Sequence, residues 1–262
     1  MQIKIYQVDA FADKIFQGNP AAVCPLTVWL DDSILLKIAS ENNLSETAFY
    51  VIKEYCVEIR WFTPNTEVDL CGHATLATAF VLVKQENFKG NKIPFHSIRS
   101  GSLPVTINED SFTLDFPLDR IREIELTNDL LQATNIKPLK AYKGKSDILL
   151  IYEKQADIEN LIPNLTQIEK LDARGLIVTS KGNDCDFVSR FFGPQVGVNE
   201  DPVTGSAHTT LTPYWAEQLN KNEFNAQQIS ARSGKLHCKL VKDRVQITGK
   251  AILYMKGELY LD

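Results

Sequence analysis

The chain has 262 residues, of which 44% are hydrophobic and 23% charged, a composition typical of globular domains and enough for one large domain or two of about 130 residues. Its formal net charge is −5 and no run of Lys or Arg occurs, which argues against nucleic-acid binding. No apolar run approaches the roughly 18 residues of a membrane helix. The five cysteines are scattered without a C-x-x-C pair, so we expect a cytoplasmic protein with reduced thiols and a small-molecule ligand.

The first part of the chain predicts strands and one outer helix before residue 63. Apolar and polar residues alternate from Met1 to Phe11, as in a half-buried strand. The elements that follow are a turn at 18–20, an amphipathic helix capped at 31–33 and ending near Ser40, a polar loop at 42–47 that contains Glu46, and strands at 48–52 and 57–62.

A helix is predicted from Cys71 to Val83, and it is apolar or small on every face. Such a helix must be buried, so we place it in the middle of a domain. It opens with Cys71, Gly72 and His73 at the end where backbone N–H groups are unpaired and the helix dipole is positive. We interpret it as an active-site helix. A hairpin over residues 100–107 and 112–116 is predicted to follow.

Two short motifs recur at nearly the same separation and predict a tandem repeat. The segment Arg60-Trp61-Phe62-Thr63-Pro64 resembles Arg190-Phe191-Phe192-Gly193-Pro194, and Arg99-Ser100-Gly101 resembles Arg232-Ser233-Gly234. Between the members of each pair, one helix opens with small residues, the second of them at Gly205-Ser206-Ala207-His208. We therefore predict two similar domains, residues 1–119 and 120–262.

The second half has weaker helical patterns. Pro213 would remove one backbone bond from a helix over 209–219, so a kink or a late helix start is expected. A second outer helix is predicted over 157–171, broken by Pro163. The last three strands are predicted at 245–248, 251–255 and 258–261.

A repeat of this kind can direct two helix N-termini into one cleft. Orphan N–H groups at Gly72 and Gly205 would then bind a carboxylate from both sides. The repeat offset sets Cys71 opposite Asp201. Two titratable groups that flank one carbon suit the removal and return of a proton without a cofactor or a metal.

Five separated motifs resemble those of the PhzF family of phenazine biosynthesis-like proteins, in that family's order and over nearly the whole chain. They are Gly18-Asn19-Pro20, Asn43-Leu44-Ser45-Glu46-Thr47-Ala48-Phe49, Cys71-Gly72-His73-Ala74-Thr75, Glu200-Asp201-Pro202-Val203-Thr204-Gly205-Ser206-Ala207 and Arg232-Ser233-Gly234. The resemblance implies an α+β, diaminopimelate epimerase-like fold. Two pseudo-symmetric domains would each wrap a mixed, largely antiparallel sheet around a central buried helix.

The resemblance also implies a function and a homodimer. A cofactor-independent isomerase of this family would use Glu46 as the base that moves a proton between carbons of a small cyclic carboxylic acid. His73, Asp201 and Ser206 match residues that line the pocket, hold the carboxylate and relay protons, and Asn19 is a further pocket candidate. As a base, Glu46 would need a pKa raised toward neutrality, which burial can supply. Cys71 replaces a small residue of PhzF, and in the related epimerase cysteines act at both helix openings.

Two other readings stay open. A thiol-dependent racemase or hydrolase could pair Cys71 with His73, although residues two apart on a helix diverge by about 200°. The same divergence, and the lack of a third ligand at zinc spacing, argues against a metal site. The fold could also serve a binding protein with no activity. His208 is expected to be structural.

Overall fold

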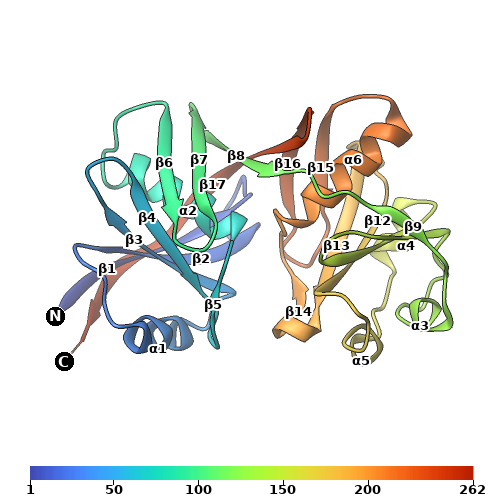
Figure 1. Ribbon diagram of the computed structural model, residues 1–262, viewed down its shortest axis with the longest axis horizontal. Coiled ribbons are helices and arrows are strands. Elements are labelled where there is room, and N and C mark those ends of the chain that lie inside the picture. Colours follow the sequence, from blue (N-terminus) through green and yellow to red (C-terminus); the bar gives the residue numbers. More distant parts are fainter. Residues whose placement is uncertain (262) are drawn as a thin grey trace. The chain divides into compact units, whose positions relative to one another are not determined.

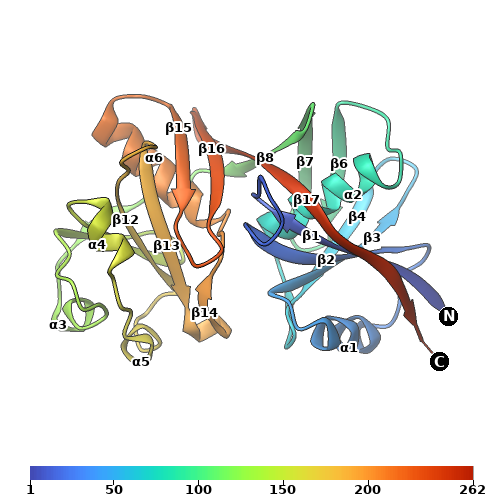
Figure 2. The same ribbon diagram turned by 180° about the vertical axis from the view of Figure 1, so that it is seen from behind.

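The computed structural model describes residues 1–261 and divides into two compact units (Figure 1). The first contains Met1–Asp115 and the chain from Thr248 onward, and the second contains Phe116–Ile247. The chain leaves the first unit in β8 (Ser111–Pro117) and returns in β17 (Arg244–Tyr260). The predicted division into 1–119 and 120–262 differs from this at the end of the chain. Residues 251–260 of β17 pair with β1 (Gln2–Ala10) and therefore belong to the first unit (Figure 2).

The first unit is a mixed sheet with two helices. Its remaining strands are β2 (Asn19–Leu26), β3 (Glu46–Ile52), β4 (Val57–Phe62), β5 (Glu67–Val68), β6 (Lys92–Ser97) and β7 (Gly101–Asn108), and its helices are α1 (Asp32–Asn42) and α2 (Gly72–Lys84). The pairs β2–β3 and β4–β6 are parallel, whereas β1–β2, β3–β4, β4–β5, β6–β7 and β7–β8 are antiparallel.

Helix α2 is the buried helix that the sequence predicts. Nine of its residues are buried: His73, Ala74, Thr75, Leu76, Ala77, Thr78, Ala79, Val81 and Leu82. It contacts β1, β2 and β3. The hydroxyls of Thr75 and Thr78 donate to the carbonyls four residues earlier, so these polar groups are satisfied inside the helix. The prediction of a central buried helix is confirmed for this unit.

The second unit has the same kind of sheet. Its strands are β9 (Arg122–Ile124), β10 (Lys140–Lys143), β11 (Asp147–Ile151), β12 (Gly175–Lys181), β13 (Phe187–Gly193), β14 (Val198–Asp201), β15 (Glu223–Gln228) and β16 (Gly234–Val241). Here β11–β12 and β13–β15 are parallel, and β10–β11, β12–β13, β13–β14 and β15–β16 are antiparallel. The same succession of parallel and antiparallel pairs occurs in the first unit from β1 to β7.

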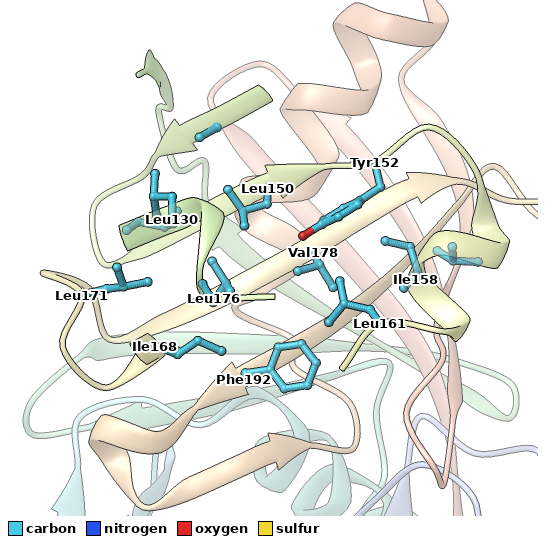
Figure 3. Close-up of a cluster of buried hydrophobic side chains, with 14 residues drawn as sticks. Leu130, Leu150, Tyr152, Ile158, Leu161, Ile168, Leu171, Leu176, Val178 and Phe192 are labelled. Carbon is cyan, nitrogen blue, oxygen red and sulfur yellow. The ribbon is translucent and has the colours of Figure 1, made fainter. Parts of the chain in front are cut away.

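Short helices cover one side of this second sheet. They are α3 (Asn128–Leu131), α4 (Gln155–Glu159), α5 (Leu165–Ile168) and the 3₁₀ turn η1 (Pro194–Val196). A cluster of buried side chains joins them to the strands, with Leu130, Ile158 and Ile168 from the helices and Val178 and Phe192 from the sheet (Figure 3). The predicted helix over 157–171 is thus two short helices, and Pro163 between them forms a bridge with Thr134.

Helix α6 (Ala207–Leu219) keeps Pro213 in its interior. Pro213 cannot donate to the carbonyl of Thr209, four residues earlier. The N–H of Asp119 donates to that carbonyl at 3.3 Å instead. The helix therefore begins at Ala207 and the expected late start is wrong, because a neighbouring loop supplies the missing donor.

Two other local predictions are wrong in detail. Glu46 is the first residue of β3 and not part of the preceding loop, since it pairs with Ala21 of β2. The three short strands predicted at the end of the chain are one strand, β17. Tyr254 is an extra residue opposite the Gln7–Val8 step, and this bulge disturbs the alternation along the strand.

Gly18 sets the course of the chain into β2. Its φ is +66°, and a Cβ there would lie 2.1 Å from the carbonyl oxygen of Ala10. Glycine is required here because the left-handed region disfavours a side chain and the close contact with Ala10 leaves no room for a Cβ. Gly101 shares the left-handed φ, at +71°, but a Cβ there would meet no atom within 4 Å.

We expect Gly18→Ala to lower the free energy of unfolding by about 3 kcal/mol, from backbone strain together with the backbone clash. The matched control Gly101→Ala carries only the strain and should cost about 1 kcal/mol. Urea unfolding of both variants measures this difference. Equal losses would show that the contact with Ala10 does not constrain the turn.

Candidate active site

Four of the predicted site residues come together in the first unit. Nδ2 of Asn19 lies 3.2 Å from Nδ1 of His73, and Sγ of Cys71 lies 3.5 Å from the same nitrogen. On the other side of the ring, Nε2 of His73 lies 3.2 Å from Oε2 of Glu46. The side chain of Glu46 is 17% exposed and that of His73 only 6%, so a ligand would meet Glu46 first.

The local structure of three elements brings these side chains together. Asn19 begins β2 directly after the Gly18 turn, and Glu46 begins β3, which runs parallel to β2. Cys71 is the N-cap of α2 with an extended backbone, φ −137° and ψ 111°. His73 lies in the first turn of α2. The site residues are therefore the first residues of two parallel strands and of the buried helix.

Asn19 determines which nitrogen of His73 carries the hydrogen. The side-chain N–H₂ of asparagine can only donate, so Nδ1 of His73 accepts its hydrogen bond. The ring hydrogen is consequently on Nε2, on the side of Glu46. Burial lowers the pKa of His73 from 6.5 to about 3, because a charged imidazolium would lose its hydration. His73 is thus a neutral imidazole with a defined tautomer.

The position of Cys71 corrects two sequence arguments. The 200° divergence does not apply to Cys71 and His73, because Cys71 precedes the helix and its extended backbone turns the thiol back to the ring. Glu46 is also a third residue near them, and one ligating atom from each of the three lies within 4.8 Å of the others. The thiol and the carboxylate, however, approach different nitrogens of the ring. One ion cannot bond to both nitrogens of one imidazole.

A second group of predicted residues lies in the second unit, around Asp201 at the end of β14. The hydroxyl of Thr204 donates to Oδ2 of Asp201 at 2.6 Å. Gln228, which is fully buried on β15, donates through Nε2 to the carbonyl of Asp201 and to the hydroxyl of Thr204. Its Oε1 accepts the N–H of Thr204 at 2.8 Å. Because Thr204 receives one hydrogen and gives its own to Asp201, the network favours the ionised carboxylate.

Ser206 adjoins this group at the opening of α6, after the buried residue Gly205. Its side chain makes no capping hydrogen bond, and its φ of −62° and ψ of −32° are helical. Nη2 of Arg174 donates instead to its hydroxyl at 3.1 Å. The capping role that an N-terminal serine often has is therefore absent at Ser206.

His208 has the structural role that the sequence predicts. It is fully buried, and its Nδ1 lies 2.9 Å from the carbonyl of Thr204. Burial lowers its pKa to about 4, although the hydrogen bond to Thr204 opposes this. Its contact supports the backbone that links Asp201 to α6.

The sequence missed the residues that support the second group. Thr204 and Gln228 bond to Asp201. Arg174 bonds to Ser206 and is itself held by Asp147. The four supporting residues lie in four separate stretches of chain. Only Thr204 falls within a motif that we had singled out. A buried Gln at the end of a strand and a lone Arg before a glycine have no sequence signature, so only the fold reveals them.

Comparisons with known proteins place these residues in context. The family model for phenazine biosynthesis-like proteins (PhzC-PhzF) matches residues 8–257. An uncharacterized isomerase of Pseudomonas aeruginosa is 51% identical over 261 residues, which cover 100% of both chains. The crystal structure of a PhzF-family protein of Enterococcus faecalis has a TM-score of 0.97 at 44% identity, with both chains covered fully. A hydroxyproline epimerase of Agrobacterium vitis shares the fold alone, with a TM-score of 0.63, 9% identity, and 100% and 93% of the two chains covered.

Neutral burial of His73 predicts how stability depends on pH. The unfolded chain takes up a proton near pH 6.5, whereas folded His73 does so only near pH 3. The contribution of His73 to the free energy of unfolding is therefore fully present above pH 6.5. It falls by about 1.4 kcal/mol for each pH unit below that value, down to about pH 3. His73→Gln should flatten the pH dependence of unfolding by this amount between pH 6 and pH 4.

The exposed residue His96 provides the control, since His96→Gln should leave the slope unchanged. Nitrogen-15 NMR of the imidazoles at pH 6 should show the Nε2–H tautomer for His73. An Nδ1–H tautomer, or an unchanged slope in His73→Gln, would contradict the assignment.

Proposed function

Because the chain belongs to the PhzF family of phenazine biosynthesis-like proteins, we propose that it is an isomerase that moves a proton between carbons of a small cyclic carboxylic acid. The observation that carries this proposal is the pairing of Glu46 with neutral His73, 3.2 Å apart at the opening of a buried helix. A carboxylate beside a fixed N–H donor has the composition of an acid–base site. No cofactor enters the proposed steps.

In the proposed reaction, the carboxylate of Glu46 takes a proton from a carbon next to double bonds that are conjugated with the substrate carboxyl group. The electron pair of the broken C–H bond moves into the conjugated system and forms an enolate-type anion. The resulting carboxylic acid of Glu46 then returns the proton to a different carbon, so the atoms of substrate and product are the same. Nε2 of His73 lies 3.2 Å from Oε2 of Glu46, so the imidazole stays beside the carboxylate through both steps.

The negative charge that develops on the substrate oxygens needs donors. In the first unit, we assign this role to the N–H group of Gly72 at the opening of α2. In the second unit, we assign the binding of a carboxyl group to the hydroxyl of Ser206 and the N–H group of Gly205 at the opening of α6. Asp201 of the second unit offers a fixed carboxylate, because Thr204 donates to its Oδ2. An acceptor of this kind binds a donor group of the substrate. The relative named as an isomerase supports the reaction class.

We expect Glu46→Gln to lower the rate of solvent deuterium incorporation into substrate acids by at least about a hundredfold, because an amide cannot accept the carbon-bound proton. The assay screens small cyclic carboxylic acids in deuterium oxide by proton NMR. The exposed Glu41 of α1 gives the control, and Glu41→Gln should exchange like the wild type. Equal exchange by Glu46→Gln would remove Glu46 as the base. A wild-type protein without exchange on any acid would favour a binding protein.

A thiol mechanism is a second candidate, and the 3.5 Å contact between Cys71 and His73 is the observation in its favour. In a Cys71–His73 pair, the imidazole would have to take the thiol proton and become an imidazolium. Burial of His73 opposes that charge, and Asn19 already donates to the nitrogen that faces Cys71. The arrangement therefore fits a thiol that donates weakly to Nδ1 better than a thiolate.

Cys71→Ala should consequently retain deuterium exchange within about threefold, since the thiol contributes packing and one weak hydrogen bond. Iodoacetamide at neutral pH should label Cys71 slowly, because the side chain is 6% exposed. Rapid labelling together with a loss of about a hundredfold or more in Cys71→Ala would establish the thiol mechanism instead. The homodimer implied by the family stays a prediction, which sedimentation can test.

A further inference from the structure

Ser206 is held in an unusual way for a residue at the start of a helix. We propose that Arg174, fixed by Asp147, is a positioning residue that makes the Ser206 hydroxyl a hydrogen-bond donor toward a bound carboxylate. The proposal rests on the proposed function, in which Ser206 binds the substrate carboxyl group. Arg174 and Asp147 would hold the hydroxyl of Ser206 in a fixed direction, and that direction would favour a carboxylate over an uncharged group.

The direction of one hydrogen bond carries the argument. A guanidinium has five donors and no acceptor, so the 3.1 Å contact from Nη2 of Arg174 must end on a lone pair of the Ser206 oxygen. The hydroxyl hydrogen of Ser206 then points away from Arg174. Without this constraint a hydroxyl rotates and can either accept or donate.

Other helix starts in the same unit show what Ser206 does not do. The side chain of Thr127 accepts the N–H of Leu130 at the start of α3, and that of Asn164 accepts the N–H of Gln167 at the start of α5. Ser206 makes no such capping bond. One of the two lone pairs of its hydroxyl oxygen accepts from Arg174 instead.

Arg174 is itself rigidly placed. Its Nε and Nη2 donate to the two carboxylate oxygens of Asp147 at 2.9 and 2.5 Å. The side chain of Asp147 is 4% exposed, and its backbone is paired with Gly175 between β11 and β12. The guanidinium also lies 5.3 Å from the ring centre of Phe191. A Cβ on Gly175 would come within 2.3 Å of that ring, so the glycine lets the ring pack beside Arg174.

The charges around Arg174 indicate that it contributes to carboxylate binding by orienting the Ser206 hydroxyl and not by attracting the anion. Asp147 neutralises it through two hydrogen bonds, and Asp119 and Asp201 add negative charge nearby. A neutralised guanidinium attracts a distant anion weakly. It still orients the hydroxyl beside it, so a carboxylate is favoured over an uncharged amide of the same shape through Ser206.

The test uses benzoate and benzamide as probes, with binding measured by calorimetry on the intact protein. The wild type should bind benzoate about tenfold more tightly than benzamide, as expected for a hydrogen bond to a charged group. Ser206→Ala should lose this preference. The paired variant Arg174→Met with Asp147→Asn leaves no unpaired charge buried and should lose it to the same extent. Combining all three substitutions should cause no further loss.

Lys221→Met is the matched control. Lys221 also pairs with a carboxylate, that of Asp186, and lies 5.3 Å from the ring centre of Phe224, beyond the other end of α6. It should keep the full preference for benzoate. Should the paired variant fail to fold, Arg174→Lys retains the charge beside Asp147 but loses the fork that reaches Ser206, and the same loss is expected.

Three results would overturn the proposal. They are an unchanged preference when Arg174 is replaced, no preference in the wild type, and an additional loss when Arg174 is replaced in Ser206→Ala, which would mean direct contact with the ligand. The measurement involves no turnover. A failed isomerase assignment would appear instead as missing deuterium exchange with the benzoate preference intact.

Discussion

In each unit, a bidentate ion pair between an arginine and a glutamate on the adjacent short strand holds the segment of chain that leads to the candidate site residues. Arg60 on β4 bonds to Glu67 on β5 at 2.7 and 2.9 Å, and Arg190 on β13 bonds to Glu200 on β14 at the same two distances. Each guanidinium also lies over a phenylalanine two residues along its own strand, at 5.1 and 4.9 Å. Strands of two and four residues make few backbone bonds, so these pairs hold the strands in place just before Cys71 in the first unit and at Asp201, the last residue of β14, in the second.

In both groups of candidate site residues, an N–H group that can only donate sets the direction of the hydrogen bonds around it. The side-chain N–H₂ of Asn19 assigns the tautomer of His73, and that of Gln228 directs the hydroxyl of Thr204 to Asp201. Arg174 occupies one of the two lone pairs of the Ser206 oxygen. Burial makes these directions costly to reverse. The neutral state of His73 thus has two consequences, because it reduces stability in acid and supplies an N–H beside Glu46.

Particular residues show how far the sequence predicts this structure. Helix α2 was predictable because small and apolar residues on every face leave a helix only a buried position. Arg60 and Phe62 recur as Arg190 and Phe192 in the repeated motif. In a strand, residues two apart lie on one face, so this spacing is consistent with a packed Arg–Phe pair in each unit. Glu46 was misplaced in a loop because its neighbours are polar, and only the pairing with β2 makes it a strand residue. Pro213 was expected to disturb its helix because proline lacks an N–H. The compensating donor, Asp119, lies 94 positions earlier in the chain, so local pattern could not reveal it.

The sequence by itself determined the family, the buried helix and the candidate site residues, because these depend on local pattern and on motifs that the chain carries in order. The tertiary structure decided how those residues are arranged. It put Cys71 back against His73 through an extended N-cap, brought Glu46 to the other ring nitrogen, and gave Ser206 a bond from Arg174. Hydrogen-bond direction and burial depend on neighbours that are distant in sequence, and no spacing along the chain encodes them.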